Sequence, residues 1–196
     1  MFLVYNITIE KTGGIILNNK TRQITFTALF LAIAIVSQFV GSNLGGAGFL
    51  GQYITGTIVN MCLMLSGIMV GIYSGLTIGV LSPCLAFFLG IIKFPFAIPV
   101  VIAGNIVFVL ITVLIYKAVS DKSLGLKAVV MIITVIAAAA VKALVMWLLS
   151  KYVLNIFTVV PAPLVASFAF PQVITGSLGG LLSLALLPIL KKAKAV

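Results

Sequence analysis

The stretch AVVMIITVIAAAAVKALVMWLLS, residues 128–150, is long and apolar enough to cross a membrane, and it carries one charged residue, Lys142, well inside it. Holding an ammonium group at bilayer depth costs about 2.5–3.5 kcal/mol on insertion scales. An ionisable residue inside a span is therefore a sign of function. The open question is whether Lys142 contacts a protein partner, a water-filled cavity or a ligand.

The composition of the whole chain is that of an integral membrane protein. Hydrophobic residues make up 63% of the 196 residues, charged residues make up 7%, and the mean hydropathy is +1.37. Soluble domains are about 45–50% apolar and about 25% charged. We therefore expect an all-α protein embedded in the lipid bilayer. The net charge of +10 would suggest nucleic acid as a partner of a soluble protein, but here it fits lysines that flank spans, and no nucleic acid is expected.

The side chains present exclude the common catalytic sets. The chain has no His, and its only acids are Glu10 and Asp121, so neither a Ser-His-Asp triad nor a carboxylate pair can form. Cys62 and Cys84 lie in apolar runs, which indicates packing rather than a metal site or a disulfide. We expect no enzyme, no metal and no cofactor. Because neither acid lies in a span, cation-coupled transport is also disfavoured.

Six candidate spans follow residue 22, each close to the length of about 20 apolar residues that a span needs. Residues 1–22 are interpreted as a cytoplasmic extension and residues 23–196 as a six-helix membrane domain. The spans are predicted at about 24–40, 54–72, 76–92, 97–117, 128–150 and 169–190. One very long helix from 54 to 92 is the competing interpretation. It would far exceed a hydrocarbon core of about 30 Å, so a tight hairpin is predicted at Gly71–Gly75.

The positions of Lys and Arg predict the orientation. With six spans and the N-terminus inside, nine of these residues fall on the cytoplasmic side, and only Lys93 and Lys151 fall outside. Both termini are therefore expected in the cytoplasm. Three external loops result, at residues 41–53, 93–96 and 151–168. Two of them are long, as loops that cover a functional site often are.

Strong hydrogen-bonding side chains come from five predicted spans and gather in their outer halves. Asn60, Asn105 and Lys142 lie at a similar depth, about 9–12 Å below the outer surface at a helical rise of about 1.5 Å per residue. Gln38 and Gln172 lie at the outer ends of the first and sixth spans. This set favours a polar pocket that opens outward and binds a small molecule. No acid in the spans can neutralise Lys142, so an anionic ligand group is its natural partner.

Less specific interpretations of these residues stay open. The amides can simply bond between helices, at about 0.6 kcal/mol each on average, and Lys142 can snorkel to the outer interface. Trp147 is either part of an interfacial aromatic belt or a stacking contact for the ligand. Gln52 and Lys93, in two of the external loops, complete the candidate substrate-binding set.

Small residues recur every four positions, a spacing that lets helix backbones approach closely. The glycines of this pattern are Gly67, Gly71, Gly75, Gly79, Gly176 and Gly180. We interpret them as packing within the bundle. Ala28 and Ala32 repeat the spacing near the cytoplasmic end of the first span, where they either pack within the bundle or contact a partner protein.

These features together resemble the substrate-binding S components of energy-coupling factor (ECF) vitamin transporters. The resemblance rests on the six spans, the Gly-rich loop after the first span and the A-x-x-x-A motif of Ala28 and Ala32, and it covers nearly everything after residue 22. Four runs share the general look of the family: QYITGTIVN (52–60), SPCLAFFLG (82–90), IPVVIAGN (98–105) and FPQVITGSLGG (170–180).

The resemblance implies a multi-pass protein of a prokaryotic plasma membrane that binds a vitamin or related micronutrient in an external pocket closed by its loops. It implies as partners two cytoplasmic ATPases and a transmembrane coupling subunit, which Ala28 and Ala32 would contact. The lack of acids in the spans disfavours a cationic vitamin such as thiamine, and a carboxylate-bearing vitamin such as pantothenate suits Lys142. Flavins and cobalamin stay open. So do two other classes, a stand-alone small-solute transporter or channel and a structural subunit of a membrane complex.

Overall fold

The computed structural model describes residues 19–43, 49–153, 156 and 162–192. Most of the predicted N-terminal extension, residues 1–18, lies outside these ranges, and residues 19–22 belong to the first helix. The helices are α1 (Asn19–Asn43), α2 (Phe49–Met69), α3 (Ile72–Phe88), α4 (Ala97–Ala118), α5 (Leu124–Leu148), α7 (Ala162–Ser167) and α8 (Phe170–Lys192). A short π-helical segment, η1 (Leu149–Val153), extends α5.

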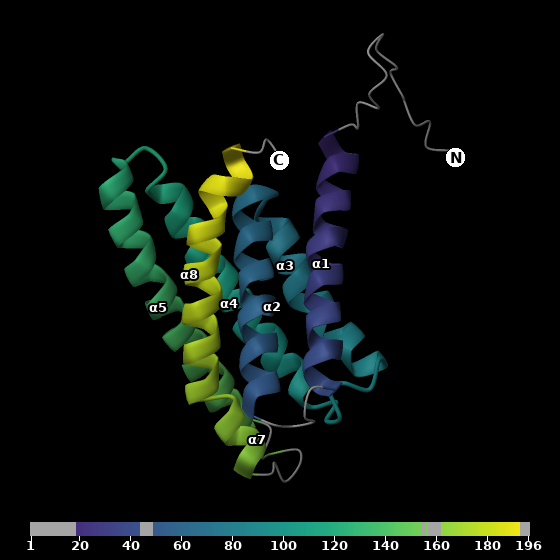
Figure 1. Ribbon diagram of the computed structural model, residues 1–196. Coiled ribbons are helices and arrows are strands. Elements are labelled where there is room, and N and C mark those ends of the chain that lie inside the picture. The colour runs from purple at the N-terminus through teal and green to yellow at the C-terminus, as the bar shows by residue number, and fades with distance from the viewer. Residues whose placement is uncertain (1–18, 44–48, 154–155, 157–161, 193–196) are drawn as a thin grey trace.

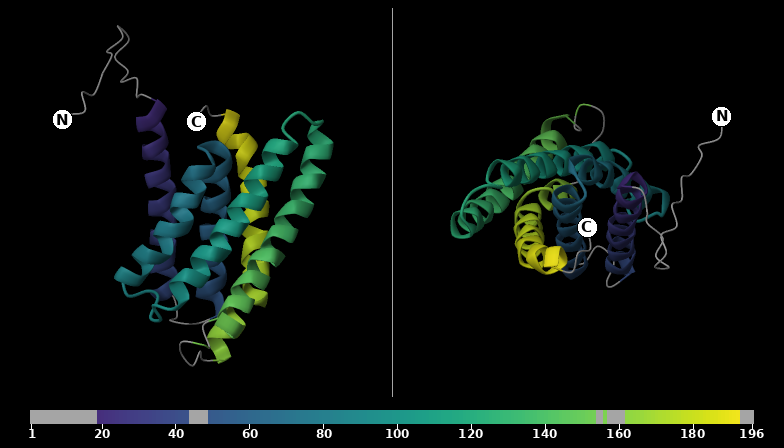
Figure 2. Two further views of the ribbon diagram at one scale, coloured as in Figure 1. Left: turned by 180° about the vertical axis from the view of Figure 1, so that it is seen from behind. Right: turned by 90° about the horizontal axis from the view of Figure 1, so that it is seen from above.

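The predicted all-α membrane fold is confirmed. Five of the helices are long and apolar enough to cross a membrane by length and composition, and α3, with 17 residues, is a shorter apolar helix. The six long helices form two layers, with α8, α2 and α1 in one and α5, α4 and α3 in the other (Figures 1 and 2). The start of α1 and the end of α8 lie at the same end of the bundle (Figure 1).

Helix α2 is the centre of the bundle because it contacts α1 and α8 in its own layer and α3 and α4 in the other. Its run from Cys62 to Leu65 is buried on every side. Phe108 of α4 and Met131 of α5 complete the core from the second layer. Ser74 of α3 exchanges a 2.7 Å hydrogen bond with Thr27, which ties α3 to α1.

The break between α2 and α3 lies at Val70 and Gly71, and the rest of the predicted hairpin already belongs to α3. Gly71 has φ +142°, a conformation that side-chain-bearing residues rarely adopt. Its N–H donates to the Ser66 carbonyl at 3.1 Å, which closes the end of α2. The predicted hairpin therefore begins at the correct residue, Gly71, but includes residues that belong to α3. Because the turn comes early, α3 begins and ends about four residues before the predicted span.

The first and third external loops are shorter than predicted, whereas the second, between α3 and α4, is longer and runs from residue 89 to 96. In the first, α1 continues to Asn43 and α2 begins at Phe49, so only residues 44–48 separate them, and these lie outside the described ranges. The third contains η1 and the short helix α7. The Gly-rich stretch 41–53 and the stretch 151–168, which contains Pro161 and Pro163, are typical of loops by composition, and composition does not reveal a helix that is stabilised by tertiary contacts.

The packing interpretation is confirmed for three glycines at two helix contacts. Gly176 and Gly180 of α8 face Ala139 and Val135 of α5, and Gly67 of α2 faces Val113 of α4. An added Cβ at each of them would collide with these side chains. Gly71 differs from the others, because a Cβ there would meet nothing within 4 Å and its role is conformational.

Gly179, which lies outside the spacing-of-four pattern, brings the backbones of α8 and α2 together. An added Cβ would collide with the Thr57 carbonyl oxygen and lie 2.9 Å from the Met61 nitrogen. Backbone atoms cannot turn aside as a side chain can, so Gly179→Ala is expected to lower the free energy of unfolding by about 1–3 kcal/mol. Thermal unfolding in detergent measures this loss.

The matched control is Gly125→Ala near the start of α5, where an added Cβ meets nothing within 4 Å. Alanine has the higher helix propensity, so this variant should keep or raise the melting temperature. Equal losses in the two variants would contradict the close-approach explanation.

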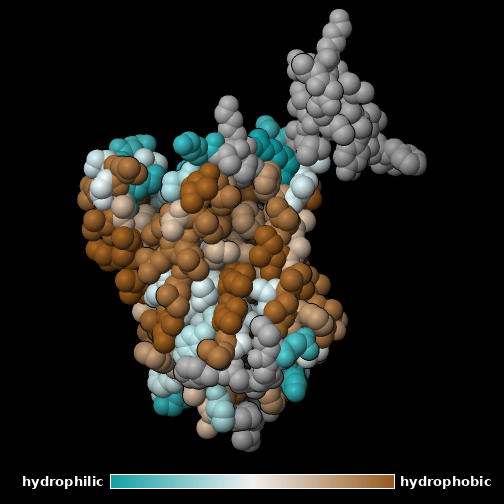
Figure 3. Space-filling view, viewed as in Figure 1, coloured by the Kyte–Doolittle hydropathy of each residue, from teal (hydrophilic) through white to brown (hydrophobic). Residues whose placement is uncertain are grey.

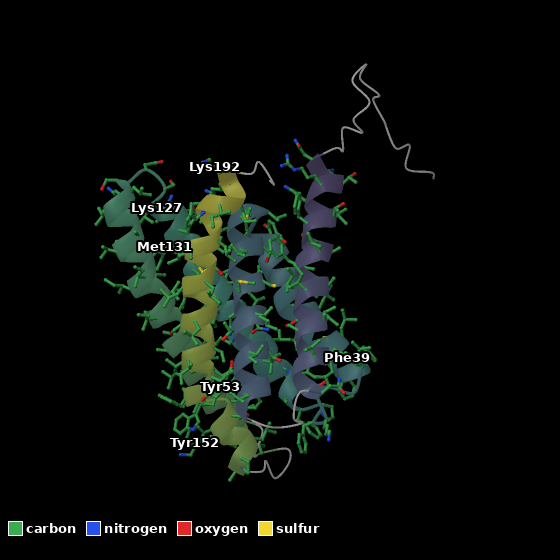
Figure 4. All side chains as sticks on the ribbon, in the orientation of Figure 1. Phe39, Tyr53, Lys127, Met131, Tyr152 and Lys192 are labelled. Carbon is green, nitrogen blue, oxygen red and sulfur yellow. The ribbon has the colours of Figure 1, made fainter. Side chains whose placement is uncertain are left out.

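The surface of the bundle has the polarity expected in a bilayer. Figure 3 shows apolar residues over most of the helix length and hydrophilic residues at both ends of the bundle, including the end where α8 terminates. Exposed apolar side chains include Leu29 and Val36 on α1 and Ile133 on α5. Figure 4 places Lys127 and Lys192 at the end that carries the termini, and Tyr53 and Tyr152 toward the opposite end.

Candidate functional site

A cavity of about 750 Å³ is lined in part by the end of α1, the start of α2, the connector between α3 and α4, and α7. These segments lie at the end of the bundle opposite the start of α1 and the end of α8 (Figure 1). All six long helices, α7 and the connector between α3 and α4 contribute to its lining. Its volume falls in the range of about 300–1,000 Å³ typical of small-molecule sites. Seven of the eight side chains predicted to bind a substrate line it: Gln38, Gln52, Asn60, Lys93, Asn105, Lys142 and Gln172. The eighth, Trp147, is not among the lining residues.

Lys142 lies at the inner wall of this cavity and is only 2% exposed. Its Nζ donates hydrogen bonds to Asn60 Oδ1 at 2.7 Å and to Asn105 Oδ1 at 2.9 Å. The snorkelling interpretation of Lys142 is therefore wrong. Two amide oxygens satisfy the ammonium group inside the bundle, so its side chain has no need to reach the interface.

The amide groups of the two asparagines have a defined orientation. Asn60 Nδ2 donates to the Gly56 carbonyl at 2.8 Å, and Asn105 Nδ2 donates to the Gly79 carbonyl at 3.2 Å. Because each nitrogen bonds to a backbone oxygen, each side-chain oxygen is turned toward Lys142. Gly79 permits this arrangement, since an added Cβ would lie 3.3 Å from the Asn105 Cβ. The contacts join α2, α3, α4 and α5 around one ammonium group.

The charge of the site is positive. Among the described residues, the lining contains two cations, Lys142 and Lys93, and no Asp or Glu. An ammonium group has three donors, and the two asparagines accept from two of them. The ring of Phe108, with its centroid 5.6 Å from Nζ, is a further neighbour of the Lys142 charge. The neutral amide oxygens reduce the cost of burying the ammonium group but do not neutralise its charge. The cavity can therefore accommodate an anionic group.

Two glutamines connect the mouth of the cavity to α7. Gln52 Nε2 of α2 donates to the Ser167 carbonyl at 3.2 Å, and Gln172 Nε2 of α8 lies 3.5 Å from the same oxygen. Gln38 Nε2 donates within its own helix, to the Ala34 carbonyl at 3.2 Å. Each amide retains further hydrogen-bonding capacity. The three residues can therefore combine a structural contact with contacts to a polar ligand.

Trp147 lies near the end of α5 and packs against Tyr152 rather than into the cavity. The two rings meet edge-on at 6.3 Å, and Lys151 Nζ lies 4.8 Å from the Trp147 ring centroid. Tyr152 and Lys151 are exposed. These contacts fit the interfacial-belt interpretation of Trp147.

Sequence reasoning did not find the hydroxyl groups of the lining. Ser42, Thr55 and Ser82 line the cavity, and Thr55 Oγ1 donates to the Ser37 carbonyl at 3.2 Å. Ser and Thr occur in every long helix of this chain, so residue type alone does not single these three out. Their role depends on the rotation of each helix about its axis.

Ala28 and Ala32, the candidate partner contacts, are both exposed on α1. Leu29 and Ile33, one position further along, are exposed as well. The two alanines therefore form a shallow stripe between larger apolar side chains. Such a stripe can take the backbone of a second helix at close distance.

Comparison with known proteins identifies the family. The model of the family described as "ECF transporter, substrate-specific component" matches residues 22–191 and so contains every residue that lines the cavity. No curated protein and no solved structure gives a significant match. The resemblance seen in the sequence is confirmed. The chain belongs to the substrate-specific components of ECF transporters, membrane proteins that bind a transport substrate and are not enzymes.

Proposed function

We propose that this chain binds a carboxylate-bearing vitamin in the cavity around Lys142, and that pantothenate is the best candidate. One observation carries the proposal: a buried ammonium group in a cavity whose described lining has no acid. A ligand carboxylate would supply the missing negative charge where water is excluded and charge-assisted hydrogen bonds are strong. A cationic vitamin such as thiamine would meet two lysines and no carboxylate.

The lining suggests how such a ligand is held. Asn60 and Asn105 act as positioning residues that hold the Lys142 ammonium in place. The amides of Gln38, Gln52 and Gln172 offer donors and acceptors to hydroxyl and amide groups further along the ligand. Val59, Val101 and Phe168 provide apolar contacts. Lys93 provides a second positive charge, which attracts an anion toward the cavity.

The test is to identify the small molecule that remains with the protein during purification in detergent, by mass spectrometry. A stoichiometric vitamin that carries a carboxylate is expected. Calorimetry should then show that pantothenate binds more tightly than pantothenol, the alcohol that lacks the carboxylate. A stoichiometric neutral or cationic vitamin would reject the substrate proposal and leave the family assignment intact. If no ligand is retained, the comparison of pantothenate with pantothenol decides, and equal affinities would reject the role of the carboxylate.

We further propose that both termini are cytoplasmic and that the cavity opens to the outside of a prokaryotic plasma membrane. The distribution of positive charge supports this orientation. Arg22 and most of the lysines that the structure describes belong to the end of the bundle with the start of α1 and the end of α8, whereas Lys93 and Lys151 belong to the other end. Ala28 and Ala32 would contact the transmembrane coupling subunit, which acts with two ATPases. Their exposure on α1 supports this role.

A further inference from the structure

Two lysines contact one tyrosine at the end of the bundle that carries the termini. Lys191 Nζ of α8 donates a 2.7 Å hydrogen bond to the Tyr116 hydroxyl and lies 5.2 Å from the ring centroid. Lys127 Nζ of α5 lies 4.2 Å from the same centroid and 3.5 Å from the Ser120 carbonyl oxygen. Three helices, α4, α5 and α8, therefore bring two ammonium groups to one half-buried phenol ring.

These two positive charges have no carboxylate partner in the described part of the chain. Asp121 is the one acidic residue in that part, and its Oδ1 accepts a hydrogen bond from Ser120 Oγ at 3.1 Å. In that part, the polar contacts of the two ammonium groups are with the Tyr116 side chain and the Ser120 carbonyl. Like charges held on one ring repel each other, so an anion between them would stabilise the arrangement.

The surroundings of the cluster indicate what kind of anion it meets. Leu124 is 86% exposed, and Leu126 and Val129 on the same first turns of α5 are exposed too. Figure 3 shows the hydrophilic end of the bundle directly above its apolar surface, and Figure 4 places Lys127 at that level. Positive charge beside exposed apolar side chains is the pattern of the lipid headgroup region.

We propose that Tyr116, Lys127 and Lys191 bind the headgroup phosphate of an anionic phospholipid. The phosphate oxygens accept hydrogen bonds from both ammonium groups. The Tyr116 oxygen accepts from Lys191, so its own O–H is available to donate to the phosphate. The acyl chains then lie along the apolar surface beneath the cluster. This geometry suits a lipid rather than free phosphate, because only a lipid also covers the apolar side chains.

The test measures lipid binding to the full chain in nanodiscs and in detergent. Native mass spectrometry with phosphatidylglycerol or phosphatidylcholine as the probe should show preferential retention of phosphatidylglycerol. The double variant Lys127→Gln with Lys191→Gln is expected to weaken that retention about tenfold, because it removes both charge-assisted hydrogen bonds to the phosphate. Tyr116→Phe keeps the ring and removes the hydroxyl, so a smaller loss is expected.

The matched control is Lys122→Gln with Lys192→Gln, which removes two positive charges from the same end without touching Tyr116. It should retain phosphatidylglycerol like the unmodified chain. Equal losses in both double variants, or no loss in the first, would overturn the proposal. If the first double variant does not fold, Lys191→Gln alone tests the proposal, since Lys191 is exposed.

The melting temperature of the protein gives a second measurement. Phosphatidylglycerol should raise the melting temperature, and inorganic phosphate should not. An equal rise with inorganic phosphate would overturn the assignment to a lipid.

Discussion

Replacing Lys142 by Met is expected to weaken pantothenate binding about a hundredfold, because losing one partner of a buried, hydrogen-bonded charge pair costs about 2–5 kcal/mol. Methionine has a similar length and no charge, so the change removes the ammonium group with little change in volume. Binding of pantothenol, which has no carboxylate, should change far less. Calorimetry with the two ligands measures both effects on the purified protein.

Two further variants isolate the contribution of the ion pair to binding. Lys151→Met removes one charge from the same end of the molecule, outside the cavity lining, and should leave affinity unchanged. Asn105→Asp keeps the size of the side chain and places a carboxylate oxygen at the position 2.9 Å from Lys142 Nζ. It should remove the preference for pantothenate over pantothenol. Lys142→Met could fail to fold, because two amide oxygens lose their hydrogen-bond donor. Asn105→Asp then still tests the ion pair, since it keeps Lys142 in place. Unchanged pantothenate affinity in Lys142→Met would reject the ion pair.

The double variant Ala28→Trp with Ala32→Trp is expected to abolish uptake while vitamin binding stays intact. Both alanines are exposed on α1 and neither lines the cavity. Two indole rings would fill the shallow stripe and keep the backbone of a coupling-subunit helix at a distance. Uptake of labelled pantothenate by cells that contain the coupling subunit and ATPases measures the loss. Calorimetry on the purified variant checks binding.

The control for this variant is Leu29→Trp with Ile33→Trp, on the neighbouring exposed stripe of the same helix. It adds the same two rings and should retain most of the uptake. Loss of vitamin binding in the alanine variant would contradict the docking assignment. Transport into liposomes that contain this chain alone would instead favour a stand-alone transporter.

The bundle could be predicted because apolar length and flanking charge determine spans with little help from tertiary contacts. The helical rise also placed Lys142, Asn60 and Asn105 at one depth, and in the structure the three are hydrogen-bonded. Less could be said of the α2–α3 turn. Hydropathy is nearly uniform there, and only the backbone conformation shows that Gly71 rather than Gly75 reverses the chain.

The details of the cavity could not be predicted for a related reason. The long helices are apolar on most faces, so the pattern does not show which side of each helix points inward. Trp147 therefore could not be assigned to belt or cavity, and the hydroxyls of Thr55 and Ser82 did not stand out. The orientation of the Asn60 and Asn105 amides depends on the carbonyls of Gly56 and Gly79, which come from two helices.

The two asparagine oxygens also bear on how the proposed anionic ligand would leave the cavity. A binding protein in a transport cycle must release its cargo as well as capture it, and a carboxylate that left behind a bare buried ammonium would dissociate very slowly. In the structure, Asn60 and Asn105 accept hydrogen bonds from Lys142 Nζ at 2.7 and 2.9 Å. If the ligand is the proposed carboxylate, these neutral oxygens would satisfy the ammonium group after the anion has left and so lower the cost of the unloaded state. Under the proposed function, the two asparagines would therefore set the balance between affinity for the anion and its rate of release.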